Sequence, residues 1–355
     1  MPSQCKREPL TSDEANRLAT KSRSETLPFS YAAAAMAVAH FRLAYYRFVL
    51  KATTDIQLPA YKGSSFRGGF GHALKHTVCI APEHVCHACL FRTQCLYPYI
   101  FDTKLETHDA EGEGEASLPR PFVLVPPLED YQHYHPGDLL TCDLVLIGEA
   151  IAYLPHFIAT MAALGGIGVG KGKGSFTITQ VQALRPQAPA CEIYAGHEHT
   201  LHNVHPPVTG EELVLPYQGL SPRRITLAFV TPTRLKHHQR LLKEAPAFHI
   251  VMRRLLDRLA EFSLFYHNTP LALDFQAWKS HAEQIRLVAS RVTAYDWERY
   301  SNRQRTRMKL GGIVGTVTYE GALAPFMPFL ALGEWLHVGK GATFGLGKYR
   351  ILEAL

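Results

Sequence analysis

The sequence lacks a long apolar run that would span a bilayer, and it lacks a secretory signal at its start. Its first residues are polar and include Lys6, Arg7, Asp13 and Glu14. The apolar segment 31–39 is too short and begins too late to change this interpretation. We therefore expect a cytoplasmic protein with no membrane contact.

Cysteine is scarce, with 7 in 355 residues, yet four cysteines fall close together in the first half. These are Cys79, Cys86, Cys89 and Cys95, spaced C-x6-C-x2-C-x5-C. Outside an oxidising compartment such a cluster indicates metal rather than disulfides. We expect a structural zinc with no open coordination position. An iron–sulfur cluster or four reduced thiols are the alternatives, and His84 or His87 could replace a ligand.

Acidic residues are absent from segment 299–309, which carries five cations. A second basic stretch covers residues 223–243, whereas segment 102–115 is acidic. The net charge of +6 is modest, so the distribution matters more than the sum. Positive charge gathered in the C-terminal half indicates an anionic polymer as partner.

Two glycine-rich stretches each follow an apolar segment and precede a short alternating run. One is 165–175 after 151–164, and the other is 338–350 after 323–336. A dinucleotide fingerprint is excluded because it needs a strand before the glycines and a helix after them. A phosphate-binding P-loop fails because Gly172 stands where Ser or Thr should hold magnesium. The repetition predicts two similar domains, each offering a lysine-bearing turn to a polyanion.

Hydrophobic patterning gives the order of elements within each half. Strands are predicted at 41–50, 139–147 and 224–230, helices at 66–78 and 248–265, and a β pair at 288–297 and 311–319. With the final helix and strand, the second half has the order βαββαβ, which is the ferredoxin-like order that RNA recognition modules also use.

We therefore predict an α+β protein with two tandem ferredoxin-like domains. Residues 1–38 form a tail, 39–185 the N-terminal domain with the cysteine insertion, 186–222 a linker, and 223–355 the C-terminal domain. The acidic segment 102–121 is expected to be a flexible loop, and the histidines of the linker are interpreted as incidental.

Several of these segments together resemble a known family. The glycine loop 339–347, the run 297–304 and the run 311–319 resemble the CRISPR repeat-RNA endoribonucleases of the repeat-associated mysterious protein (RAMP) superfamily. Segment 66–74, followed by four cysteines, is similar to a bacterial branch of that family. The resemblance covers residues 41–355.

The resemblance implies two ferredoxin-like domains that bind CRISPR repeat RNA and cut precursor CRISPR RNA. Cleavage would need no metal: the 2′-hydroxyl attacks the adjacent phosphate, the 5′-oxygen leaves, and a 2′,3′-cyclic phosphate remains. Other CRISPR effector subunits are possible partners. The alternatives are a RAMP subunit that binds guide RNA without cutting it, and a zinc-dependent enzyme centred on the cysteines.

The resemblance also implies candidate site residues. The family usually places a catalytic histidine on or just before the first helix, which corresponds here to His72 or His76, with Tyr61 and Lys75 nearby. Tyr300 could stack on a base. RNA contacts are assigned to Lys171, Lys173, Arg299, Arg303, Arg305, Arg307, Lys309, Gly339, Lys340, Gly341, Gly345, Gly347 and Lys348.

Overall fold

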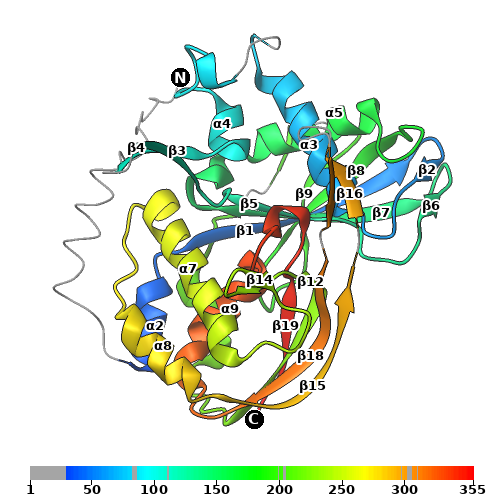
Figure 1. Cartoon of the computed structure of the whole chain (residues 1–355). Coiled ribbons are helices and arrows are strands. Elements are labelled where there is room, and N and C mark those ends of the chain that lie inside the picture. Colours follow the sequence, from blue (N-terminus) through cyan, green and yellow to red (C-terminus); the bar gives the residue numbers. More distant parts are fainter. Residues whose placement is uncertain are drawn as a thin grey trace.

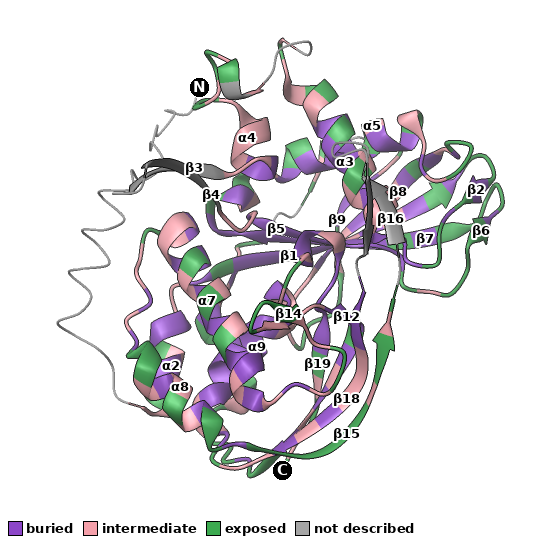
Figure 2. Ribbon diagram, in the orientation of Figure 1, coloured by how far each residue is buried: buried purple, intermediate pink, exposed green. Residues whose placement is uncertain are grey.

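The computed structural model describes residues 29–81, 86–109, 112–198, 200–202, 205–296, 298–301, 306–309 and 311–355. Two domains built on the same plan lie one above the other, the N-terminal domain at the top of Figure 1 and the C-terminal domain below. Buried residues concentrate in the sheets and on the helix faces that cover them (Figure 2). The tandem ferredoxin-like fold is confirmed in both halves by strand order.

The N-terminal domain is built on β1 (Arg42–Ala52), α3 (Gly63–Val78), β5 (Phe122–Val125), β7 (Leu139–Ile147), α5 (Leu154–Ile167) and β8 (Phe176–Leu184). Its sheet runs β10-β9-β8-β1-β7-β5, with β11 (Val208–Thr209) also pairing with β1. Taken as the first to fourth strands of a βαββαβ unit, β1, β5, β7 and β8 have the ferredoxin-like order 4-1-3-2.

The C-terminal domain repeats this topology. Its elements are β12 (Arg224–Thr233), α7 (Phe248–His267), α8 (Phe275–Glu283), β15 (Arg286–Tyr295), β18 (Gly312–Glu320), α9 (Met327–Leu336) and β19 (Tyr349–Ala354). The sheet order is β15-β18-β12-β19, the same arrangement as in the first domain. Between β15 and β18 the chain forms a second hairpin, β16 (Glu298–Ser301) with β17 (Thr306–Lys309).

Local sequence explains why α3 packs where it does. Phe66, Phe70, Ala73 and Leu74 recur at helical spacing, and all are buried in the core of the N-terminal domain. Thr77, one turn after Ala73, does not continue the stripe: it is exposed, and its hydroxyl donates to the carbonyl of Ala73. The stripe lies against α5, so the opposite face of α3 is directed to solvent.

Three segments for which the sequence predicted no helix or strand contain such elements in the structure. Part of the expected tail is α2 (Tyr31–Val38), whose Ala34, Ala37 and Val38 are buried in the core of the C-terminal domain. The expected flexible loop contains β3 (Lys104–Asp109) paired with β4 (Gly112–Ser117). The expected linker supplies β9 (Cys191–Ala195), β10 (Thr200–Leu201), β11, α6 (Gly210–Val214) and η4 (Leu215–Tyr217). These short elements extend the sheet and pack against neighbours, which single-sequence periodicity does not reveal.

The remaining short elements connect the main ones. They are β2 (Ile56–Gln57) paired with β6 (His133–Tyr134), β13 (Lys236–His237) paired with β14 (Arg240–Leu241), and the helical turns η2 (Cys86–Ala88), α4 (Leu96–Phe101), η3 (Gly148–Tyr153), η5 (Ala324–Phe326) and η6 (Ala342–Phe344).

One helical run, Gly148–Ile167, is long and apolar enough by length and composition to cross a membrane, contrary to our expectation from the sequence. Phe157, Met161 and Leu164 of this run are buried in the core of the N-terminal domain. The run therefore serves here as a core helix of the ferredoxin-like unit.

Candidate active site and nucleic-acid interface

Helix α3 carries His72 and His76 on its exposed face, one turn apart. Their ring centroids lie 4.5 Å apart in an edge-to-face arrangement. Partial burial lowers the pKa of His72, and the nearby His76 and Lys173 lower it further. His72 is therefore neutral at pH 7 and able to accept a proton.

The other two candidate catalytic residues do not join this pair. Tyr61 is buried, its hydroxyl donates to the carbonyl of Phe344 at 2.8 Å, and burial raises its pKa. Lys75 lies on the side of α3 that faces the cysteines, with its amine 6.0 Å from the ring centroid of Tyr97. The structure thus gives Tyr61 a place between the domains and Lys75 a place beside the cysteine cluster.

The first glycine loop presents its lysines to solvent. Lys171 and Lys173 are both exposed, and Lys173 is the residue that influences His72. The backbone of the loop is fixed by Val169 and Gly174, which bond to each other, and by the amide of Lys171, which donates to Gln57. The loop thereby holds two exposed cations in place, and Lys173 lies near enough to His72 to influence its pKa.

The second glycine loop is packed against the N-terminal domain. A Cβ added to Gly345 would lie 2.5 Å from Cδ of Pro126, and one added to Gly63 would overlap the carbonyl of Phe344. The guanidinium of Arg67 lies 4.7 Å from the Phe344 ring centroid and 4.1 Å from that of Phe101. Gly345 and Gly347 are buried, so this part of the loop is a joint between domains and is closed to RNA.

Lys340 and Lys348, both expected to contact RNA, differ in environment. Lys340 is exposed at the outer edge of the loop. Lys348 is buried, its amine donates to the hydroxyl of Tyr45 at 3.2 Å, and burial lowers its pKa. The expectation for Lys348 is corrected because a side chain that is 8% exposed and already bonded across the domain boundary is not open to a phosphate.

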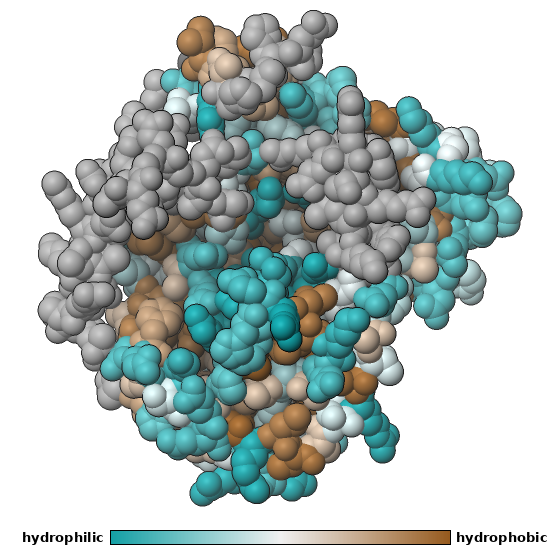
Figure 3. All heavy atoms as spheres, in the orientation of Figure 1, coloured by the Kyte–Doolittle hydropathy of each residue, from teal (hydrophilic) through white to brown (hydrophobic). Residues whose placement is uncertain are grey.

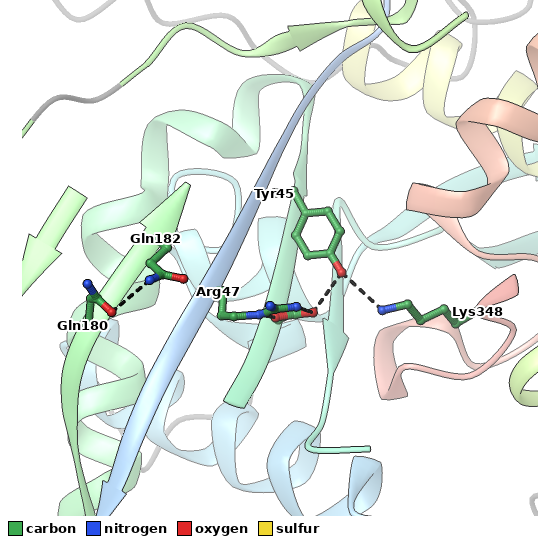
Figure 4. Close-up of polar contacts among 6 residues, drawn as sticks. Tyr45, Arg47, Gln180, Gln182 and Lys348 are labelled. Atoms are coloured by element: carbon green, nitrogen blue, oxygen red, sulfur yellow. Dashed lines mark hydrogen bonds and ion pairs between the residues drawn. The ribbon is translucent and has the colours of Figure 1, made fainter. Parts of the chain in front are cut away.

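Figure 4 shows the polar network that receives Lys348. The Tyr45 hydroxyl donates to Asp143 at 2.9 Å, and Arg47 donates to the same carboxylate from Nε at 2.8 Å. Arg47 keeps 40% of its side chain exposed, on the sheet face that also bears Gln180 and Gln182. Sequence reasoning missed Arg47 because a single arginine inside an apolar strand gives no signal.

The basic hairpin β16–β17 extends the ribbon formed by β15 and β18. Tyr295, at the end of β15, is close enough to Tyr61 to influence its pKa, so this ribbon reaches the start of α3. Arg303 and Arg305 lie outside the described residues. The side chains of Arg299, Tyr300, Arg307 and Lys309 are likewise not described, so their assignment to RNA stays a prediction.

The four cysteines of the insertion face one small cavity of about 20 Å³, which Lys75 and Arg92 also line. Burial raises the pKa of the Cys95 thiol, and the other three thiols raise it further. Among the described residues, no group of three or more His, Cys, Asp or Glu side chains has the geometry of a metal site. The four thiols line the same cavity, as the ligands of a tetrahedral ion would. To bind an ion, the sulfur atoms would have to move to metal–ligand distances as it enters.

Comparison with known proteins agrees with this architecture. Residues 227–349 match the family model of the CRISPR-associated endoribonuclease Cas6, and residues 41–206 match a model described as an N-terminal domain. An uncharacterized protein of Archaeoglobus fulgidus is 25% identical over 308 residues, covering 83% of this chain and 92% of that protein.

Solved structures share the fold across both domains. Thermus thermophilus Cas6 superposes with a TM-score of 0.51 at 16% identity, covering 88% of this chain and 99% of that chain. A partial Cas6–RT–Cas1–Cas2 complex gives a TM-score of 0.53 at 15% identity, covering 89% of this chain and 47% of that chain. The cysteine-bearing branch suggested by the sequence stays a prediction. The C-terminal domain therefore matches the Cas6 family model, and the two domains together have the fold of the solved Cas6 structures.

Proposed function

We propose that this protein is an endoribonuclease that binds CRISPR repeat RNA and processes precursor CRISPR RNA. The observation that carries the proposal is the exposed pair of His72 and His76 on α3, next to Lys173. The Cas6 family match over residues 227–349 and the likeness to a Cas6 product complex, with a TM-score of 0.51, support the same substrate class.

In the proposed mechanism the chemistry uses side chains alone. A neutral imidazole of the pair takes the proton from the 2′-hydroxyl, which attacks the adjacent phosphorus. The 5′-oxygen leaves with a proton supplied by the second imidazole in its protonated form, and a 2′,3′-cyclic phosphate remains. Lys173 stabilises the negative charge that develops on the phosphate oxygens. Both histidines lie on the same face of α3, and the lowered pKa of His72 favours it as the base.

The test is cleavage of the cognate repeat RNA in EDTA, comparing the wild type with the His72→Ala/His76→Ala variant. We expect the variant to bind RNA normally and to lose at least about a hundredfold in cleavage rate, the usual contribution of general acid–base catalysis. His205→Ala, at an exposed histidine outside α3, is the matched control and should cut normally. Normal cleavage by the double variant would place the active site elsewhere, and tight binding without cleavage by the wild type would favour a non-cutting RAMP subunit.

We also propose a structural zinc ion at Cys79, Cys86, Cys89 and Cys95. Four thiols around one cavity, in an insertion with little apolar core of its own, support this assignment. We expect about one zinc per chain by elemental analysis, and removal by a strong chelator should lower the melting temperature. Cys95→Ser should lower zinc content, whereas Cys191→Ser, outside the cluster, should not. Bound iron with visible absorption would show that the site holds an iron–sulfur cluster instead of zinc. A metal-free protein of unchanged stability would show that the cysteines do not form a metal site.

A further inference from the structure

The hairpin β13–β14 bears a strained turn. Its two central residues, His238 and Gln239, have φ of 46° and 60°, in the left-handed region that hairpin turns of this length normally fill with Asn or Gly. Side chains larger than glycine at such positions cost free energy and persist where the surroundings or function require them. The turn separates His237 from Arg240, which pair across the hairpin.

The hairpin packs beside the first turns of α7 and gathers positive charge there. The ring of His237 lies 4.0 Å from that of His238 and 6.2 Å from that of His249. The guanidinium of Arg254 donates to the carbonyl of Lys236 at 3.0 Å, which ties the helix to the hairpin. Arg253 is exposed on the same part of the helix. The first turn of α7 has no acidic residue, so its dipole adds to the positive potential.

This cluster continues the exposed edge of the second glycine loop. The amide of Lys340 donates to the carbonyl of Arg234 at 3.0 Å, two residues before the hairpin begins. Figure 3 shows hydrophilic residues gathered at the centre of this face, where Figure 1 places β14. Lys340 and the hairpin thus form one surface of positive charge on the C-terminal domain.

We propose that hairpin β13–β14 and the first turns of α7 form a second RNA contact surface, which binds the phosphodiester backbone of a segment outside the cleavage site. This inference rests on the proposed function. It assigns His237, His238, Arg240, His249 and Arg253 to the surface, and Lys340 connects it to the joint between domains. Among the described ion pairs, the acid paired with this cluster is Asp257, whose carboxylate lies 3.4 Å from the guanidinium of Arg254. The cations of the surface outnumber this acid, so the surface suits a phosphate backbone.

The histidines make this contact stronger in acid. The pKa of His237 is lowered in the free protein, first by desolvation and then by the nearby His238, His249, Arg253 and Arg254. The groups facing it are Lys236, Arg240, Arg253, Arg254, His238 and His249, with Asp257 opposing them and Lys340 and Arg234 on the adjoining loop. Bound phosphates favour the protonated rings, so binding takes up protons. Affinity should therefore rise as the pH falls from 7.5 to 5.5.

The experiment measures binding of cognate repeat RNA carrying a 2′-deoxy nucleotide at the cleavage position, which prevents cutting. Arg240→Gln/Arg253→Gln is compared with Lys279→Gln/Arg286→Gln, which removes two cations elsewhere on the same domain, Lys279 with 41% of its side chain exposed and Arg286 with 73%. We expect the first variant to lose at least about tenfold in affinity. The slope of log affinity against log salt concentration should also fall by roughly 1–2, which corresponds to the loss of one to two phosphate contacts. The control variant should bind like the wild type, and thermal melts check that all variants fold.

A pH series on His237→Gln/His238→Gln tests the second part, and we expect it to lose the gain in affinity between pH 7.5 and 5.5. If the wild type does not bind repeat RNA, the proposed function itself fails. If the wild type binds and the Arg240/Arg253 variant matches the control in affinity or salt slope, this surface is not an RNA contact, although the proposed function stands. If the histidine variant keeps the same gain in affinity at low pH, the assignment of His237 and His238 to the surface is wrong.

Discussion

The two glycine loops have one backbone plan and opposite uses. The residue that caps the C-terminus of α5 is Gly168, with φ 88° and ψ 158°, and the one that caps α9 is His337, with φ 61° and ψ 164°. In both loops the amide of the following lysine donates to a backbone carbonyl that comes after the first strand of the unit. Lys171 donates to Gln57, in β2, at 2.9 Å, and Lys340 donates to Arg234, just after β12, at 3.0 Å. The duplication inferred from sequence thus extends to single hydrogen bonds.

The loops differ in length between equivalent glycines. One residue, Lys173, separates Gly172 from Gly174, whereas residues 342–346 separate Gly341 from Gly347. The additional residues form η6 and insert against α3 and β5 of the other domain. The shorter loop leaves its lysines exposed to solvent, whereas the longer loop buries its additional residues against the other domain. A glycine-rich turn therefore does not by itself indicate a ligand site, since packing decides its use.

The largest expected contrast comes from adding a methyl group to each loop. Gly345→Ala puts a Cβ at φ 79° and 2.5 Å from Cδ of Pro126, so we expect a loss of about 3 kcal/mol or more in the free energy of unfolding. Gly172→Ala has φ 83° with nothing within 4 Å of the added carbon, so the loss should be about 1 kcal/mol. Urea denaturation measures both, and equal losses would contradict the assignment of the second loop as a joint.

A smaller contrast separates the lysines. Lys348→Met removes a buried hydrogen bond to Tyr45 and should lower the free energy of unfolding by about 1–3 kcal/mol. Lys171→Met, at an exposed position, should change it by less than about 0.5 kcal/mol while weakening RNA binding. Denaturation and RNA titration of the same two variants give the comparison. A stable Lys348 variant with weakened RNA binding would restore the original assignment of Lys348 to RNA.

The smallest contrast is in pH dependence. Burial, then the charge of Lys348, hold the pKa of His337 well below 6.5. The unfolded chain therefore takes up a proton below pH 6.5 that the folded chain refuses, and stability is lost as the pH falls, by up to about 1.4 kcal/mol per unit. His337→Gly, which copies Gly168, should remove this slope between pH 6.5 and 5. His40, whose pKa is lowered to about 4, titrates in both proteins and cancels in the difference.

Local pattern was enough to predict the fold, because each ferredoxin-like unit has long periodic elements. The strand at 139–147 and the helix beginning at residue 248 were predicted from alternation and helical spacing, and both are present. Short elements such as β5 and β9 were missed, since four or five residues fix no period. Within the site, His72 and His76 lie together on α3 because four residues make one helical turn. The burial of Lys348 and Tyr61 depends on the other domain, which local sequence cannot reveal.

Trp335 gives the joint an intrinsic optical reporter. Its ring lies 5.2 Å from that of Tyr45, across the boundary closed by η6, and it packs with a small apolar cluster that includes Ala342 and Val125. Separation of the domains would hydrate this indole and shift its fluorescence to longer wavelength. With Trp278 and Trp297 replaced by phenylalanine, emission from Trp335 alone would follow opening of the joint in real time, without an attached dye.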